Sequence, residues 1–309
     1  MNHQLKCISL ETGRSIPIPD QTLLCLGNFD GVHYAHRKLI LSAIEWQKQH
    51  CPEASVGVFC FDELPARYLD PNFQGKLCTA EARLTRFREC GASFAILADF
   101  TVLRDLSAQD YIQSVLIESC NAVAVACGYN HRFGKGGLGN EELLKTYFGE
   151  NMYLQDAVYL GGETVSSSRI RQLLQNGRPD EAAVLLTVPY EITAPVLHGK
   201  ALGSRMGTPT VNQLLPEGGI ALRRGVYVTE SLVNGEWLRS VTNVGVRPTV
   251  NDGGGVNCET YLLNFSGDLY GRQMTVKFLK FIRDEQKFED TDALWRQIRA
   301  DVQLARDYH

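Results

Sequence analysis

The sequence from residue 23 to residue 36 reads Leu23-Leu24-Cys25-Leu26-Gly27-Asn28-Phe29-Asp30-Gly31-Val32-His33-Tyr34-Ala35-His36. It begins as an apolar run, continues through two glycines and leads into a helical pattern. Residues 23–29 form a short apolar run, which is typical of a strand buried on both faces of a parallel sheet. Apolar side chains then recur at helical spacing, at Leu39, Ile40, Ala43 and Ile44. Because a strand followed directly by an amphipathic helix is the start of a βαβ unit, this stretch favours an α/β domain.

Three further apolar runs continue this pattern as far as about residue 186. They cover residues 56–61, 94–100 and 122–128, with helix-like stretches between them. One of these stretches begins with Ser107-Ala108-Gln109-Asp110, which resembles the start of a helix. Open parallel sheets bind ligands beyond the carboxyl ends of their strands. We therefore expect the site in the loops that follow Phe29 and Gly128.

The pattern changes after Pro189, where segments become alternating or β-rich. These segments are residues 191–196, 225–232, 237–244, 258–265 and 274–281. Asn234-Gly235 lies between two of them and predicts a hairpin, because both residues tolerate positive φ. Closely spaced strands with tight turns indicate an antiparallel barrel or sandwich, and an apolar stripe predicts a helix over residues 291–306. We expect two domains, residues 1–186 and residues 187–309.

The composition argues against several classes of partner. Lys and Arg number 31 and Asp and Glu 35, so the formal net charge of -4 provides no global basic field for nucleic acid or an anionic membrane. No apolar run approaches the roughly 20 residues of a membrane-spanning helix, and the first residues lack a signal-peptide pattern. The 9 cysteines are scattered without a CxxC pair, so we expect reduced thiols and a cytoplasmic location.

Three segments of the first half carry residues suited to phosphate chemistry. Between Gly27 and His36, glycines permit close backbone approach, and His33 and His36 lie on one side of a helical turn. Two histidines at this spacing are a weak signal alone, but their place after the first strand favours a functional role. Residues 128–137 are either a solvated glycine-rich loop or a basic loop around a polyphosphate. Residues 165–171 are either a serine helix cap or a phosphate clamp completed by an arginine.

In this order and on this kind of sheet, the three segments resemble the nucleotidyltransferase half of the bacterial bifunctional riboflavin kinase/FMN adenylyltransferase (FAD synthetase) family. The family's first motif, Gly-x-Phe-Asp-Gly-x-His-x-Gly-His, is matched except that Ala35 replaces the last glycine. The second and third motifs are matched at Gly128, Asn130, Phe133 and Gly134 and at Ser166, Ser167 and Arg171. The family usually carries a Pro-His-Pro-type element after its second strand, and residues 61–65 lack that histidine.

The second half resembles the family's kinase domain. The kinase segment of the family ends Gly-Phe-Pro-Thr-Ala-Asn, and this chain has Gly207-Thr208-Pro209-Thr210-Val211-Asn212. Ser204 replaces the usual arginine and Thr208 the usual aromatic residue. Glu259 aligns with the family's catalytic glutamate. A strand glutamate is ordinarily a solvated outward residue, and we expect this one to point into the barrel instead.

The resemblance spans almost the whole chain and implies both a fold and two reactions. The implied fold is a Rossmann-like N-terminal nucleotidyltransferase domain with a parallel sheet, followed by an antiparallel β-barrel riboflavin kinase domain with a terminal helix. Glu259 would act as the base that lets riboflavin take the γ-phosphate of ATP, with Mg²⁺ held by Thr210 and Asn212. FMN would then attack a second ATP at His33 and His36, giving FAD and pyrophosphate. The other residues that the resemblance assigns to binding are Gly27, Phe29, Asp30, Asn130, Ser167, Ser168, Arg171 and Gly207.

Other interpretations stay open at this point. The barrel could work while the α/β half has lost adenylyl transfer through Ala35 and the missing histidine element. Alternatively, the chain could bind or sense flavin without catalysis, with Ser204 marking a defective kinase site. A cytidylyltransferase would use the same first motif, but it leaves the barrel unexplained. Under the favoured interpretation the partners are riboflavin, FMN, FAD and ATP, with neither nucleic acid nor membrane.

Overall fold

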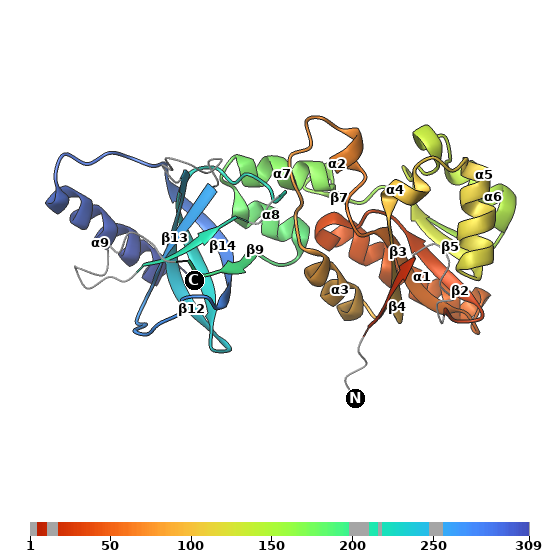
Figure 1. Cartoon of the computed structure of the whole chain (residues 1–309), viewed down its shortest axis with the longest axis horizontal. Coiled ribbons are helices and arrows are strands. Elements are labelled where there is room, and N and C mark those ends of the chain that lie inside the picture. Colours follow the sequence, from red (N-terminus) through yellow and green to blue (C-terminus); the bar gives the residue numbers. More distant parts are fainter. Residues whose placement is uncertain (1–4, 11–17, 198–209, 216–217, 247–255, 309) are drawn as a thin grey trace. The chain divides into compact units, whose positions relative to one another are not determined.

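The computed structural model describes residues 5–10, 18–197, 210–215, 218–246 and 256–308 (Figure 1). Its contacts divide the chain into two compact units. The first unit contains Met1–Phe73 and Cys78–Ser167, and the second contains Gln74–Leu77 and Ser168–His309. Helices α7 (Ser167–Gln175) and α8 (Pro179–Leu186) thus pack with the C-terminal half of the chain.

The first unit is built on a six-stranded parallel sheet. Its spatial order is β1-β4-β3-β2-β5-β6. The strands are β1 (Lys6–Leu10), β2 (Thr22–Leu26), β3 (Ser55–Phe61), β4 (Phe94–Ala98), β5 (Ala122–Gly128) and β6 (Met152–Gln155). The four strands expected from the apolar runs are confirmed as β2, β3, β4 and β5. The edge strands β1 and β6 were not anticipated, because each is short and shows no extended apolar run.

Helices cover both faces of this sheet. Successive residues of β2 point to opposite sides: Leu23 and Cys25 pack with α1 (Tyr34–His50) and α3 (Ala80–Glu89), whereas Leu24 and Leu26 pack with the π-helical segment η2 (Tyr111–Ser119) and α6 (Glu141–Phe148). The remaining pieces of this unit are the short helices α2 (Ala66–Leu69), α4 (Phe100–Leu103) and α5 (Ala108–Asp110), the 3-10 turns η1 (Asp30–Val32) and η3 (Lys135–Gly137), and the small hairpin of β7 (Tyr159–Leu160) and β8 (Glu163–Thr164). The expected helix start is also confirmed, since the Ser107 side chain accepts a hydrogen bond from the backbone N–H of Asp110.

The strand order places the functional loops at one point of the sheet. The chain runs from β2 through β3 and β4 on one side, and then continues on the other side of β2 with β5 and β6. The carboxyl ends of β2 and β5 therefore flank the switch point at which parallel sheets bind ligands. The loops that follow them are the two that the sequence singled out.

The second unit is a curled antiparallel sheet of six strands in the order β10-β13-β12-β11-β14-β9. The strands are β9 (Tyr190–Pro195), β10 (Thr210–Leu214), β11 (Gly225–Val233), β12 (Glu236–Val246), β13 (Val256–Leu262) and β14 (Gln273–Arg283). Its edge strands β9 and β10 come together through an isolated bridge between Leu197 and Asn212. The expected hairpin joins β11 to β12, with φ of 52° at Asn234 and 88° at Gly235.

The two faces of the curled sheet differ in what they bury. The concave interior holds large side chains such as Tyr227 and Phe278 together with a chain of hydroxyls, in which Thr242 contacts both Thr229 at 2.8 Å and Thr260 at 2.9 Å. Part of the outer face is covered by α9 (Thr291–Asp307), the expected terminal helix, which packs most closely on β12 and β11 (Figure 1). In the part of the chain that the structure describes, no helix is both long and apolar enough to cross a membrane.

Candidate active sites

The loop after β2 is held in a strained, compact form. Phe29 has a φ of 51° and Gly31 a φ of 79°, and the buried Asp30 lies between them. The turn ends at His33, which caps α1 by accepting the backbone N–H of His36 on Nδ1 at 3.4 Å. Non-glycine residues in the left-handed region cost free energy and cluster at functional sites. The sequence motif from Gly27 to His36 thus forms a turn and a helix start, as expected.

The two histidines of this motif lie face to face. The rings of His33 and His36 are stacked, with centroids 3.6 Å apart and planes 13° from parallel. The Phe29 ring lies 5.1 Å from the His36 ring. Burial, and secondarily the nearby His33, lower the pKa of His36 well below its usual 6.5. The His36 imidazole is therefore neutral at pH 7, and its buried Nδ1 has no hydrogen-bond partner among the described residues.

The third motif is tied to the first through Ser167. Its Oγ donates to the backbone carbonyl of Asp30 at 3.1 Å, and both residues belong to the first unit. Ser168 is exposed, and Ser168 and Arg171 belong to the second unit. There the Nε of Arg171 donates to the carbonyl of Gly75 at 2.8 Å.

The second motif forms a loop anchored in the core rather than a free glycine-rich loop. Phe133 is buried and packs with Tyr111 of η2. Gly134 has a φ of 70°, and a Cβ there would lie 2.7 Å from the Cα of Ala108, so only glycine fits. Arg132 pairs with Glu141 at 2.9 Å. Asn130 is exposed just beyond the carboxyl end of β5, next to the strand that carries the histidine loop.

The two departures from the family pattern in the first half of the chain have a local structural setting. Ala35 lies in the first turn of α1 without a positive φ, so its methyl group causes no backbone strain. Its carbonyl accepts a hydrogen bond from the buried Gln155 side chain at 2.9 Å. After β3, where the histidine element is missing, the Asp62 carboxylate accepts the backbone N–H of Glu63.

The structure corrects the expectation about the direction of the Glu259 side chain. Its neighbours Cys258 and Thr260 are fully buried on the concave side of the sheet, and Glu259 is exposed on the opposite, outer face. The expectation that it points into the barrel is wrong, because side chains alternate along a strand and the interior positions of β13 belong to its neighbours. Its expected closeness to the described part of the Pro-Thr-Val-Asn segment, residues 210–212, is confirmed, since Glu259 pairs in register with Asn212 of β10. Pro209 lies outside the described residues.

A polar cluster surrounds Glu259 on this outer face. Asn243 of β12 is its register partner on the other side, so Asn212, Glu259 and Asn243 form one row across three strands. The outer-face cluster consists of Asn212, Asn243, Asn257, Glu259 and Glu285. Asn257, which is 7% exposed, donates its Nδ2 hydrogens to Asn212 Oδ1 and to Glu259 Oε1, each at 3.2 Å.

Glu285 completes the outer-face cluster. Its Oε1 accepts from Asn243 Nδ2 at 3.4 Å. Gly245 makes this approach possible, since a Cβ there would lie 2.5 Å from the same oxygen. Glu285 was not among the residues expected in the site.

The oxygen atoms of this region suit a hard cation. Thr210 and Asn212 are two positions apart on β10 and so lie on the same face of the strand as the Glu259 row. Mg²⁺ prefers oxygen ligands and keeps several waters, so one or two protein ligands suffice when phosphates share the ion. The described residues contain no group of three or more His, Cys, Asp or Glu that could hold a metal. Gly207, Ser204 and Thr208 lie outside the described residues.

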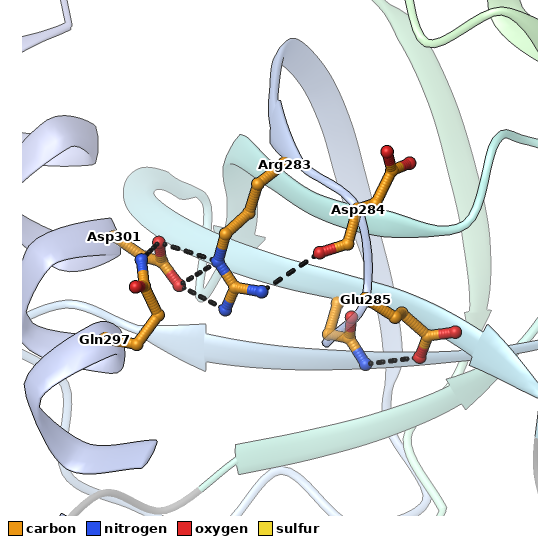
Figure 2. Close-up of polar contacts among 6 residues, drawn as sticks. Arg283, Asp284, Glu285, Gln297 and Asp301 are labelled. Atoms are coloured by element: carbon orange, nitrogen blue, oxygen red, sulfur yellow. Dashed lines mark hydrogen bonds and ion pairs between the residues drawn. The ribbon is translucent and has the colours of Figure 1, made fainter. Parts of the chain in front are cut away.

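An ion pair between Arg283 and Asp301 joins α9 to the end of β14, close in sequence to Glu285 of the outer-face cluster. Figure 2 shows Arg283, at the end of β14, pointing toward Asp301 of α9. Arg283 Nη2 lies 2.7 Å from Asp301 Oδ2, and Gln297 Nε2 donates to Oδ1 of the same carboxylate at 2.9 Å. Arg283 Nη1 also donates to the carbonyl of Asp284 at 3.1 Å, immediately before Glu285. The ion pair thus anchors the segment that carries Glu285.

Several residues of these sites carried no clear sequence signal. Asn257 and Gln155 are single amides in strands, and isolated strand amides have no characteristic spacing. Arg83 and Arg86 of α3 are buried beneath the histidine loop, although charged residues on a helix are normally exposed.

Comparison with known proteins identifies both units. A family model described as FAD synthetase matches residues 15–169, and one described as riboflavin kinase matches residues 186–309. A crystal structure described as a macrolide-efflux protein from Streptococcus pneumoniae has a TM-score of 0.90 and 28% identity, covering 99% of this chain and 100% of that one. The fold and the two matched domains therefore define a two-domain, flavin-related transferase.

The relatives make the assignment specific. The bifunctional riboflavin kinase/FMN adenylyltransferase of Escherichia coli K12 is 35% identical over 299 residues, which is 93% of this chain and 92% of the relative. The protein of the same name from Pseudomonas fluorescens is 33% identical over 295 residues, 91% of each chain. This chain belongs to the bifunctional riboflavin kinase/FMN adenylyltransferase family.

Proposed function

We propose that this chain makes FAD from riboflavin in two ATP-dependent steps, each with its own set of residues. The observation that carries the proposal is that two separate groups of polar side chains are assembled at the ends or faces of strands. One group is the histidine loop after β2, and the other is the outer-face cluster around Glu259. Under this proposal residues 1–186 carry out adenylyl transfer and residues 187–309 carry out phosphorylation.

In the phosphorylation step, Glu259 accepts the proton of the terminal ribityl hydroxyl of riboflavin. The hydroxyl oxygen attacks the γ-phosphorus of ATP, ADP leaves, and FMN forms. An exposed carboxylate is accessible to a flavin, and Asn257 fixes its orientation with a hydrogen bond at 3.2 Å. General-base catalysis of this kind contributes about 10²- to 10⁴-fold to a rate.

Thr210 and Asn212 are the residues that would hold Mg²⁺ in this step. The ion, when bound, neutralises charge on the ATP phosphates. The Thr210 hydroxyl and the Asn212 amide oxygen would be neutral metal ligands. The negative potential that favours a cation would come from the nearby carboxylates Glu259 and Glu285. Asn257 orients the Asn212 oxygen as well, through its second hydrogen bond.

In the adenylyl transfer step, a phosphate oxygen of FMN attacks the α-phosphorus of ATP and expels pyrophosphate. His33 accepts a backbone N–H on Nδ1, so the neutral tautomer that fits this bond carries its proton on Nε2. His36, kept neutral by burial, carries one ring N–H. Donors aimed at developing phosphate charge stabilise the transition state. The resemblance also assigns Ser167, Ser168 and Arg171 to phosphate binding, and Asn130 to positioning of the flavin phosphate or the nucleotide.

Both proposed steps use ATP, and the setting we propose is the cytoplasm. Every one of the 9 cysteines is a free thiol in the structure, as expected of a chain that works in a reducing compartment. Six of them are buried, and burial raises the pKa of the Cys60 thiol to about 11 and that of Cys258 to about 12. Such thiols are inert, and both proposed reactions are direct displacements at phosphorus that use no cysteine nucleophile.

The experiment that tests the proposal is a time course with riboflavin, ATP and Mg²⁺, followed by chromatography of the flavins. FMN should appear first and FAD later, and FMN supplied alone with ATP and Mg²⁺ should give FAD directly. Accumulation of FMN without any FAD would remove the adenylyl transfer step. Flavin binding without consumption of ATP would remove both steps.

A further inference from the structure

Helix α3 carries two buried arginines beneath the histidine loop. Arg83 is 3% exposed and Arg86 is 5% exposed, and the two are one helical turn apart. Phe87, on the same side of the helix, meets the Phe29 ring edge-on at 5.4 Å. This face of α3 is therefore packed directly against the turn that precedes His33.

The Arg83 guanidinium joins two loops that follow neighbouring strands. Its Nη1 donates to the carbonyl of Asn28, just after β2, at 3.3 Å. Its Nη2 donates to the carbonyl of Asp62, just after β3, at 2.7 Å. Arg86 adds a third contact, since its Nη1 donates to the carbonyl of Gly31 at 2.8 Å. The left-handed turn at Phe29 and Gly31 is thus held at both ends by guanidinium groups.

The charge of Arg83 is not balanced by a neighbouring acid. Within the described ranges, no carboxylate lies at ion-pair distance from it. Burying a cation without a counter-charge is costly, and hydrogen bonds to carbonyl oxygens recover only part of that cost. The place of Arg83 beneath the loop therefore depends on its contacts with the two carbonyl oxygens.

We propose that Arg83 is a positioning residue for adenylyl transfer, because it fixes the loops after β2 and β3 relative to each other and thereby places His33 and His36. The inference rests on the proposed function. Hydrogen bonds from a charged donor to a buried carbonyl are worth more than neutral ones, so the loss of two of them should move the loop by enough to slow the reaction.

The test compares three variants in single-turnover FAD formation, with enzyme in excess over FMN and ATP saturating. The rate constant then reports on folded, substrate-bound enzyme, whatever fraction of the protein is active. R83M removes both hydrogen bonds and the charge, whereas R83K keeps a charged donor that can reach carbonyl oxygens. R88M changes an exposed arginine of the same helix and serves as the matched control. Riboflavin phosphorylation by each variant provides an internal control from the other unit.

We expect R83M to slow the single-turnover rate constant by about tenfold or more, R83K to slow it by less than about tenfold, and R88M and riboflavin phosphorylation to be unchanged. A smaller effect of R83M, or an R83K variant as slow as R83M, would overturn the inference. If R83M fails to fold, R83Q takes its place, since it keeps one neutral amide donor. The same decrease in the single-turnover rate constant, about tenfold or more, is then expected of R83Q. Wild-type protein that makes no FAD from FMN would defeat the proposed function instead of this inference.

Discussion

The imidazole rings of His33 and His36 stack with their centroids 3.6 Å apart at the N-terminus of α1. Burial disfavours the charged form of His36, and repulsion by the stacked His33 ring adds to this effect, so the pKa of His36 is lowered well below 6.5. The two rings therefore offer hydrogen-bond donors to an anion without both being charged. The free N–H groups at the N-terminus of α1 lie beside them and also attract an anion.

His36→Ala should reduce FAD formation from FMN and ATP by about 10²- to 10³-fold, as removal of a transition-state donor does in other enzymes. Phosphorylation of riboflavin should be unaffected. His50→Ala, which removes an exposed histidine stacked on Trp46 at the other end of the same helix, serves as the control. A loss of both activities would mean that the histidine supports the whole protein and not one reaction.

Glu259→Ala should reduce riboflavin phosphorylation by orders of magnitude, about 10²- to 10⁴-fold, because the proposed base is gone. FAD formation from supplied FMN should stay nearly intact. Glu236→Ala, at an exposed position next to the hairpin turn of β12, is the matched control. Equal loss of both activities would contradict the division of labour between the two units.

Asn257→Leu should lower the rate of riboflavin phosphorylation by about 10- to 100-fold. The substitution keeps the approximate size of the side chain but removes the two hydrogen bonds that orient Asn212 and Glu259. Steady-state kinetics with riboflavin and ATP measure the effect. Gln303→Leu, which removes an exposed amide that donates to Asp307 on α9, should leave both activities unchanged. Unchanged phosphorylation in the Asn257 variant would show that the amide has no part in placing the site.

Asp301→Ala should destabilise the second unit by about 1–3 kcal/mol, because it leaves the partly exposed Arg283 guanidinium without its buried partner (Figure 2). Urea unfolding followed by circular dichroism gives the free energy of unfolding. Asp307→Ala, at an exposed position of the same helix, should change it by less than about 0.5 kcal/mol. Similar values for the two variants would show that the ion pair does not anchor α9.

The stability of the first unit should fall as the pH is lowered from about 6.5 to about 4. Burial, with a smaller effect of Arg132, lowers the pKa of His131 to about 4, and burial lowers that of His36 in the same direction. In this interval the unfolded chain binds protons that the folded chain excludes, so unfolding is favoured; above pH 6.5 both states are neutral at these histidines and the full stability is present. Urea midpoints at pH 7, 6 and 5 measure the loss.

His131→Phe is the variant that isolates the contribution of His131 to this loss. A phenyl ring can keep the packing against Phe133, whose ring lies 5.6 Å from that of His131, but it cannot bind a proton. The decline between pH 7 and pH 5 should therefore be shallower in this variant. An identical decline would show that His131 does not govern the acid sensitivity.

The edge strands and β10 show where sequence periodicity stops being informative. β10 reads Thr-Val-Asn-Gln-Leu, and asparagine is depleted in strands, so nothing local marks it as one. Its strand conformation comes from pairing with β13, nearly fifty residues further along the chain. By contrast, α1, α9 and the Asn234-Gly235 hairpin are local structures, and the sequence predicted each of them.

For the sites, local spacing predicted the order of the motifs and the turn from Gly27 to His36, because these depend on residues close together in the chain. The amino-acid sequence by itself determined the class of each half and the chemistry that its side chains offer. Only the tertiary structure decided that Glu259 lies on the outer face beside Asn212, and that Arg83 joins the loops after β2 and β3. The physical reason is that strand register, the face on which a side chain emerges and the burial of a charge all depend on partners distant in sequence.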